Sequence, residues 1–210
     1  PINEEALLTG ELEETNQWYA IEKISGIKLC QALRKQYGFD AISLMPTNLY
    51  GPNDNYHPTQ SHVMASFIKK FCEASFYKSE SVTCWGSGNP LREFMHVNDL
   101  ASAIVFCLES WDPNDKKVPL DKNGDPLLFL NVGTGKDISI KNLAIKVAEA
   151  AGYSGNIKWD KSKPDGTKKK QLNISKITQL GWEPTITLDA GIKSTVNLYN
   201  ENLKNLNLKL

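Results

Sequence analysis

The sequence has no excess of either charge and no long apolar run. Its 210 residues carry 24 basic and 24 acidic side chains, so no net attraction to nucleic acid or to an anionic membrane surface is expected. No apolar stretch reaches the roughly 18 residues that a membrane-spanning helix needs. The opening residues, PINEEALLTG, also lack the basic and apolar regions of a secretory signal. We therefore expect a cytoplasmic protein that binds small molecules, with neither nucleic acid nor a membrane as a partner.

Patterns typical of metal sites and disulfide frameworks are missing as well. The cysteines are Cys30, Cys72, Cys84 and Cys107, and none of them forms a CxxC pair or has a histidine at ligand spacing. We expect four reduced thiols, most of them buried, and no metal ion.

Stretches typical of strands alternate with stretches typical of helices along most of the chain. Helices are expected at 19–37, from Ser61 to about 71, at 100–110 with Asp99 as the cap, at 139–151, and twice near the C-terminus. Strands are expected at 40–45, 81–85, 92–97, 127–132 and 156–159, with a polar loop from Pro46 and another at 111–126. This alternation predicts an α/β fold in which helices cover a largely parallel sheet.

Tyr19 and Lys23 are four residues apart on the first expected helix, so their side chains should leave the same face. A nearby ammonium group favours the phenolate, which makes a tyrosine a useful proton donor or acceptor for a carbonyl or an alcohol. The same spacing is also found where a packed ring lies beside a solvated amine. The spacing alone leaves both interpretations open.

Several sequence blocks taken together resemble one enzyme family. They are YAIEKISGIK, MPTNLYGPNDNYHP, WGSGNPLREFMHVNDLASA and LNVGTG. In this order they resemble the extended short-chain dehydrogenase/reductase family that acts on nucleotide sugars. SHV and KPDGT strengthen the likeness to its members that convert GDP-4-keto-6-deoxy-D-mannose to GDP-L-fucose. The resemblance covers about residues 5–200 and implies a Rossmann-like, doubly wound, mostly parallel sheet with a smaller α/β substrate-binding domain.

The resemblance also implies a division of labour along the chain. Residues 1–60 would be the C-terminal part of an NADP-binding Rossmann domain. Residues 61–210 would mainly bind the GDP-sugar, with a segment at about 92–110 returning to the Rossmann domain. The family further implies NADPH as the cofactor and a homodimer as the assembly.

Individual roles follow from the same resemblance. Tyr19 would donate a proton to the C4 oxygen while NADPH delivers hydride to C4, and Lys23 would hold the nicotinamide ribose and favour ionisation of Tyr19. His62 would be the acid of the 3,5-epimerisation and would also lie near the cofactor. The nicotinamide end of the cofactor would be lined by Pro46, Thr47, Asn48 and Leu49, and the GDP-sugar would be bound by Lys70, Trp85, Arg92 and Asp165.

Some of these positions have simpler alternatives. A histidine at the start of a helix can be an ordinary polar surface residue, and Arg92 could form a structural ion pair with Asp99. The choice between Lys69 and Lys70 depends on alignment alone.

The sequence departs from the family in one respect. No G-x-x-G-x-x-G turn follows a strand, and the GTG at 133–135 comes after Tyr19 rather than before it. We therefore expect the C-terminal part of a longer enzyme, with the catalytic serine and the epimerase cysteine base upstream and little activity of its own. The alternatives are another nucleotide-sugar epimerase or dehydratase of the same fold, and a non-catalytic module that binds nucleotide sugars.

Overall fold

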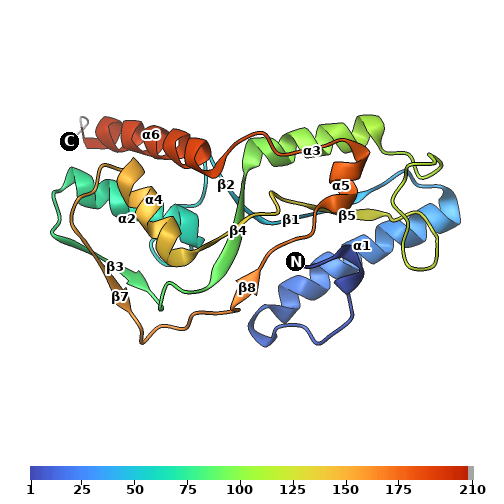
Figure 1. The fold of residues 1–210 in the computed structure, drawn as a ribbon, viewed down its shortest axis with the longest axis horizontal. Helices are drawn as coiled ribbons and strands as arrows, with labels where there is room; N and C mark the ends of the chain where they lie inside the picture. Colours follow the sequence, from blue (N-terminus) through green and yellow to red (C-terminus); the bar gives the residue numbers. More distant parts are fainter. Residues whose placement is uncertain (208–210) are drawn as a thin grey trace. The chain divides into compact units, whose positions relative to one another are not determined.

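The structure is a computed structural model that describes residues 1–207 (Figure 1). The chain forms two compact units, each built from three separate segments. Unit 1 comprises Pro1–Thr47, Leu100–Gly135 and Leu172–Glu183, and unit 2 comprises Asn48–Asp99, Lys136–Gln171 and Pro184–Leu210. The domain prediction made from the sequence concerns which part binds which ligand, and it stays a prediction.

Unit 1 is built on two parallel strands. Its elements are the short 3-10 helices η1 (Glu4–Ala6) and η2 (Glu14–Asn16), helix α1 (Gln17–Tyr37), strand β1 (Ser43–Pro46), most of helix α3 (Val97–Ser110), strand β5 (Phe129–Val132) and helix α5 (Ser175–Leu180). Strand β1 pairs with β5 from Ser43 opposite Phe129 to Pro46 opposite Val132. Parallel pairing of strands so distant in sequence requires long crossover connections, which the helices provide.

Helix α1 ends where the sequence predicts. Gly38 adopts the left-handed conformation with φ of 67°, and its N–H donates to the carbonyl of Arg34, as is common after the last helical turn. No residue of α1 is fully buried. The expected apolar face, which includes Ile24 and Ile27, is therefore only half-buried.

The first residues of unit 1 are held by a buried polar group. Glu4 is 1% exposed, and its Oε1 accepts a hydrogen bond of 3.0 Å from the backbone N–H of Asn131. The Asn131 side chain in turn donates to the carbonyls of Ile2 and Asn173. Burial raises the pKa of the Glu4 carboxyl group, because a buried carboxylate loses hydration.

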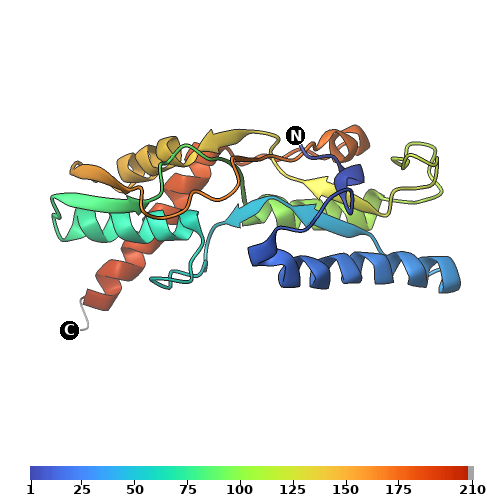
Figure 2. The same cartoon turned by 90° about the horizontal axis from the view of Figure 1, so that it is seen from below.

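Unit 2 contains three helices and two groups of strands. Its elements are β2 (Asn48–Tyr50), α2 (Val63–Phe76), β3 (Ser81–Trp85), β4 (Leu91–His96), β6 (Asp137–Ser139), α4 (Ile140–Ala150), β7 (Asn156–Asp160), β8 (Lys169–Lys170) and α6 (Leu188–Asn207). Strand β4 pairs in parallel with β2 and β8 and antiparallel with β6, while β3 pairs in parallel with β7. Figures 1 and 2 both show α2, α4 and α6 grouped together.

The core of unit 2 forms around helix α2. Met64, Ile68 and Phe71 lie on one face of this helix and are each no more than 1% exposed. They belong to a cluster with Leu143 and Val147 of α4 and with residues of α6. The three- and four-residue spacing in the sequence predicted this face of α2.

The prediction of an α/β fold with mostly parallel strands is confirmed. Three local predictions were wrong. Helix α2 is capped by His62 rather than Ser61. Asp99 lies inside α3, and its carboxylate accepts hydrogen bonds from Thr185 and Ile186. The loop expected from Pro46 contains strand β2, because pairing with β4 keeps these residues extended.

Cys72, Cys84 and Cys107 are buried, Cys30 is half-buried, and all four are free, as expected. Burial raises the pKa of Cys72 to about 12 and that of Cys84 and Cys107 to about 11, so these thiols are unreactive near neutral pH. Across residues 1–207, no helix is both long and apolar enough to cross a membrane. The same residues contain no cluster of three or more side chains suited to a metal ion.

Candidate active site

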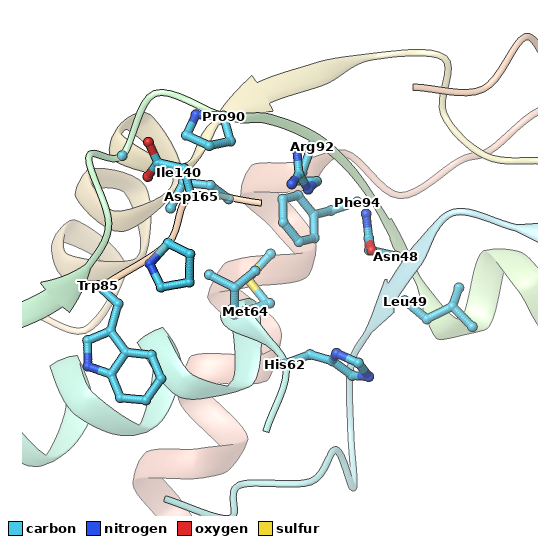
Figure 3. Close-up of a pocket in the computed structure, with 13 residues that line it drawn as sticks. Asn48, Leu49, His62, Met64, Trp85, Pro90, Arg92, Phe94, Ile140 and Asp165 are labelled. Atoms are coloured by element: carbon cyan, nitrogen blue, oxygen red, sulfur yellow. The ribbon is translucent and has the colours of Figure 1, made fainter. Parts of the chain in front are cut away.

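Unit 2 contains a cavity of about 330 Å³, shown in Figure 3. Its walls come from β2, the start of α2, the β3–β4 region, the start of α4 and the loop after β7. The lining residues are Asn48, Leu49, His62, Val63, Met64, Trp85, Gly88, Pro90, Arg92, Phe94, Ile140, Pro164 and Asp165. Six of them were predicted from the sequence as ligand-binding residues: Asn48, Leu49, His62, Trp85, Arg92 and Asp165.

Two neighbouring strands bring the first side chains to the cavity. Asn48 lies opposite Phe94 in the parallel pair of β2 and β4, and its Nδ2 donates to the carbonyl of Glu93 at 2.8 Å. One face of β4 therefore contributes Arg92 and Phe94 beside Asn48, because alternate residues of a strand point the same way.

His62 enters the cavity from the start of α2. It is the N-cap residue, with extended backbone angles of −69° and 161°, and its side chain makes no capping hydrogen bond. It is also exposed. The backbone carbonyl of His62 accepts from Ser66 N–H, so the helix start fixes the backbone while the imidazole stays accessible.

Arg92 is half-buried and holds the edge of the loop after β7. Its Nη1 donates to the carbonyls of Leu91 at 2.9 Å and Thr167 at 2.5 Å. Burial lowers the pKa of the guanidinium group, yet arginine stays charged at neutral pH. The site therefore has a cation at its wall that can bind an anionic ligand in a bidentate manner.

Trp85 presents an exposed ring beside two ammonium groups. Trp85 is 58% exposed, with Lys70 Nζ at 5.6 Å and Lys163 Nζ at 5.5 Å from the centroid of its ring. Lys70 also donates to the carbonyl of Thr83. A second cavity, of about 190 Å³, is lined by Lys70 and shares Val63 and Trp85 with the first.

The neighbouring Lys69 has a different environment. Its Nζ donates to the carbonyl of Tyr56 and lies 3.9 Å from a Glu73 carboxylate oxygen. Of the two adjacent lysines, Lys70 is thus the one placed beside Trp85.

Asp165 is tied to the turn between β3 and β4. Its Oδ1 accepts from the backbone N–H of Ser87 and its Oδ2 accepts from Ser87 Oγ, each at 2.6 Å. These hydrogen bonds lower the pKa of the Asp165 carboxyl group, because they stabilise the ionised form.

The other predicted residues, Tyr19, Lys23, Pro46 and Thr47, belong to unit 1. Tyr19 is 59% exposed on α1, and Lys23 Nζ lies 5.3 Å from the centroid of its ring. Lys23 also pairs with the adjacent Glu22 at 3.1 Å. Both side chains can therefore be reached by a bound molecule.

Several residues of the cavity were missed by sequence reasoning. Three of them, Met64, Phe94 and Ile140, are typical of core positions in the sequence, and Pro164 lies in a polar loop. The glycines around Ser87 in GSGNP marked a turn, but nothing in the sequence indicated which carboxylate would occupy it.

Known proteins with similar sequences and structures point to one group of enzymes. A family model described as the NAD dependent epimerase/dehydratase family matches residues 1–119. GDP-L-fucose synthase 1 of Arabidopsis thaliana is 48% identical over 205 residues, which is 98% of this chain and 59% of that protein. This chain thus spans about 60% of the length of the curated relatives it matches.

Solved structures show the same likeness. A GDP-6-OMe-4-keto-L-xylo-heptose reductase from C. jejuni has a TM-score of 0.85 and 31% identity, over 96% of this chain and 66% of that one. A GDP-L-fucose synthetase from Naegleria fowleri bound to NADP has a TM-score of 0.80 and 26% identity, over 97% of this chain and 62% of that one. The predicted Rossmann-like class is confirmed by this agreement.

Proposed function

Because this chain belongs to the NAD dependent epimerase/dehydratase family, we propose that the protein of which it is part is a GDP-L-fucose synthase. Its proposed reaction is the 3,5-epimerisation and 4-reduction of GDP-4-keto-6-deoxy-D-mannose to GDP-L-fucose, with NADPH as the reductant. The observation that carries the proposal is that six residues, which the family resemblance predicted as contacts of the cofactor or the GDP-sugar, line one cavity of unit 2.

The chemistry of this cavity and of the second cavity, with which it shares Trp85, suits a nucleoside diphosphate sugar. Arg92 and Lys70 supply positive charge for the diphosphate, and Trp85 supplies an exposed aromatic face. Lys163 adds a second ammonium group beside that ring. Asp165 is assigned to the same ligand as a hydrogen-bond acceptor.

Tyr19, Lys23 and the stretch Pro46–Leu49 are proposed to hold the nicotinamide end of NADP. The exposure of Tyr19 and Lys23 on α1 fits this role, and NADP in a related solved structure supports NADP over NAD. When bound, NADPH would supply the hydride for reduction at C4. Tyr19 would donate its phenolic proton to the C4 oxygen, and Lys23 would stabilise the phenolate that results.

His62 is proposed as the acid that returns protons during epimerisation at C3 and C5. An imidazole suits the role because its ordinary pKa allows both protonation states near neutrality, and the exposed ring has no capping hydrogen bond to break. Cys72, Cys84 and Cys107 do not suit the base of this step, because burial raises the pKa of each thiol.

A homodimer in the cytoplasm is proposed for the complete protein. Trp18, Leu29 and Tyr37 on α1 are between 59% and 77% exposed, which is unusual for large apolar side chains and supports a covered surface. The four free thiols fit a reducing compartment.

Product analysis with the complete protein tests the proposed function. Incubation with GDP-4-keto-6-deoxy-D-mannose and NADPH should yield GDP-L-fucose. The His62→Asn variant should still oxidise NADPH but release an incompletely epimerised sugar. Turnover of UDP-sugars alone would favour another epimerase of the family, and GDP binding without any turnover would favour a non-catalytic module. GDP-L-fucose made at an unchanged rate by the variant would remove His62 from the mechanism.

Replacing Arg92 by alanine should weaken binding of GDP or the GDP-sugar by about 1.5 to 3 kcal/mol, the usual cost of losing a hydrogen bond to a charged group. Calorimetric titration of GDP into the complete protein measures it. Lys168→Ala is a suitable control, since this lysine is exposed and does not line the cavity. If Arg92→Ala bound GDP with unchanged affinity, the guanidinium would serve the fold through Thr167 rather than the ligand.

A further inference from the structure

The loop after β7 forms one wall of the cavity without any buried side chain to place it. This loop, residues 161–168, is called the strap below. All of its residues are exposed, yet Pro164 and Asp165 line the cavity. Packing therefore does not determine where these two residues lie.

The ends of the strap are fixed by strand pairing. At one end, Asp160 pairs with Trp85 in the parallel register of β3 and β7, and its carbonyl accepts from the Gly86 N–H. At the other end, the Leu91 N–H donates to the carbonyl of Lys168, and β8 then pairs with β4. Between these ends, Arg92 Nη1 donates to the carbonyl of Thr167, and Lys163 Nζ lies 5.5 Å from the centroid of the Trp85 ring. The hydrogen bonds from Ser87 are the ones that hold Asp165, which lines the cavity.

The turn that carries Ser87 is shaped to receive this carboxylate. Gly86 and Gly88 on either side have positive φ angles of 82° and 78°, a conformation that side chains other than glycine rarely adopt. A Cβ atom at Gly86 would collide with the carboxylate of Asp165, and one at Gly88 would lie 2.9 Å from the Trp159 ring.

The Ser87 hydroxyl is itself oriented by the turn. It accepts a hydrogen bond of 3.1 Å from the Asn89 N–H, which leaves its proton directed at Asp165 Oδ2. Figure 3 shows the Asp165 carboxylate beside the loop between β3 and β4, on the same side of the cavity as Trp85.

We propose that Ser87 is a positioning residue of this cavity, which acts by holding Asp165 and thereby the strap against the β3–β4 turn. The inference rests on the proposed function, because it assigns Ser87 to the binding of the GDP-sugar. Each oxygen of the Asp165 carboxylate accepts one hydrogen bond from Ser87 and can accept another, so the carboxylate fixes the cavity wall and can still accept from the ligand. Ligand affinity then depends on a serine that does not itself line the cavity.

The test compares Ser87→Ala, Asp165→Asn and the double variant in the complete protein. Titration with GDP should show an affinity about 5- to 10-fold lower for Ser87→Ala, as expected when one of two hydrogen bonds to a carboxylate is lost. Ser87→Thr, which keeps the hydroxyl, should restore the affinity.

The effects of Ser87→Ala and Asp165→Asn on affinity should not add in the double variant, because both changes break the same contact. KM for the GDP-sugar should rise while kcat changes little.

Limited trypsin digestion gives a readout that is independent of the ligand. Cleavage after Lys161 and Lys168 should become faster in Ser87→Ala, because the middle of the strap is released. Ser162→Ala is the matched control. This change removes the 2.6 Å hydrogen bond that Ser162 Oγ donates to Asp160 at the start of the strap. Because neither residue lines the cavity, the affinity for GDP should stay within about twofold of that of the unaltered protein.

The inference would be overturned if Ser87→Ala bound GDP normally while Asp165→Asn did not, since Asp165 would then act on the ligand without being held by Ser87. Additive effects in the double variant, or an unchanged digestion pattern, would also overturn it. If GDP failed to bind the unaltered protein, the proposed function would be wrong, and digestion alone would decide whether Ser87 holds the strap.

Discussion

Replacing Tyr19 by phenylalanine in the complete protein is expected to lower the rate of NADPH oxidation with GDP-4-keto-6-deoxy-D-mannose by about 100-fold or more, the usual scale for a general acid. The change removes only the hydroxyl group. Tyr19 is 59% exposed, and Lys23 lies over its ring, a contact that phenylalanine preserves. The loss should therefore appear in kcat and leave the stability of the fold unaltered.

Tyr77→Phe is the control for this experiment, since Tyr77 lies at the end of α2, lines neither cavity and is 62% exposed. It should oxidise NADPH at the rate of the unaltered protein. Stopped-flow measurement of absorbance at saturating substrate compares the two variants. Normal turnover by Tyr19→Phe would show that its phenol is not the proton donor, and the pairing with Lys23 would then be an ordinary surface contact.

Replacing Phe71 by alanine is expected to reduce the free energy of unfolding by about 3 to 5 kcal/mol, the range for large aromatic residues truncated in a core. Phe71 is fully buried on α2. Its ring centroid lies 5.9 Å from that of Phe67 and 5.6 Å from that of Tyr153. Truncation would remove these contacts and leave a cavity that its neighbours fill only in part.

Denaturant unfolding followed by circular dichroism measures this loss. Phe76→Ala is the matched control, because Phe76 is on the same helix but is 44% exposed. It should cost less than about 1 kcal/mol. A similar loss for both variants would mean that the core of unit 2 does not depend on Phe71.

Helices whose ends carry local signals could be predicted closely from the sequence. Gly38 ends α1 because only a residue that tolerates φ of 67° fits there easily. Ser139 begins α4 because its side chain accepts a hydrogen bond from the Asn142 N–H. In both cases the deciding contact is made within a few residues of the chain.

Short strands could not be predicted in the same way. Strands β2, β6 and β8 have two or three residues each, too few to show an alternating pattern. They exist because β4 offers hydrogen bonds to all three. Similarly, Asp99 reads as a helix cap locally, but it binds Thr185 and Ile186, which are far along the chain.

The amino-acid sequence by itself determined the α/β class and the longer helices, because these depend on periodicity and local hydrogen bonds, whereas the residues proposed to bind a nucleotide sugar came from the resemblance of several sequence blocks to a known family. Only the tertiary structure decided which of those residues share a cavity. It placed Lys70 rather than Lys69 beside Trp85, and it joined Asp165 to Ser87 although 78 residues separate them. No local pattern records such a contact, since it forms only when strand pairing brings the two loops together.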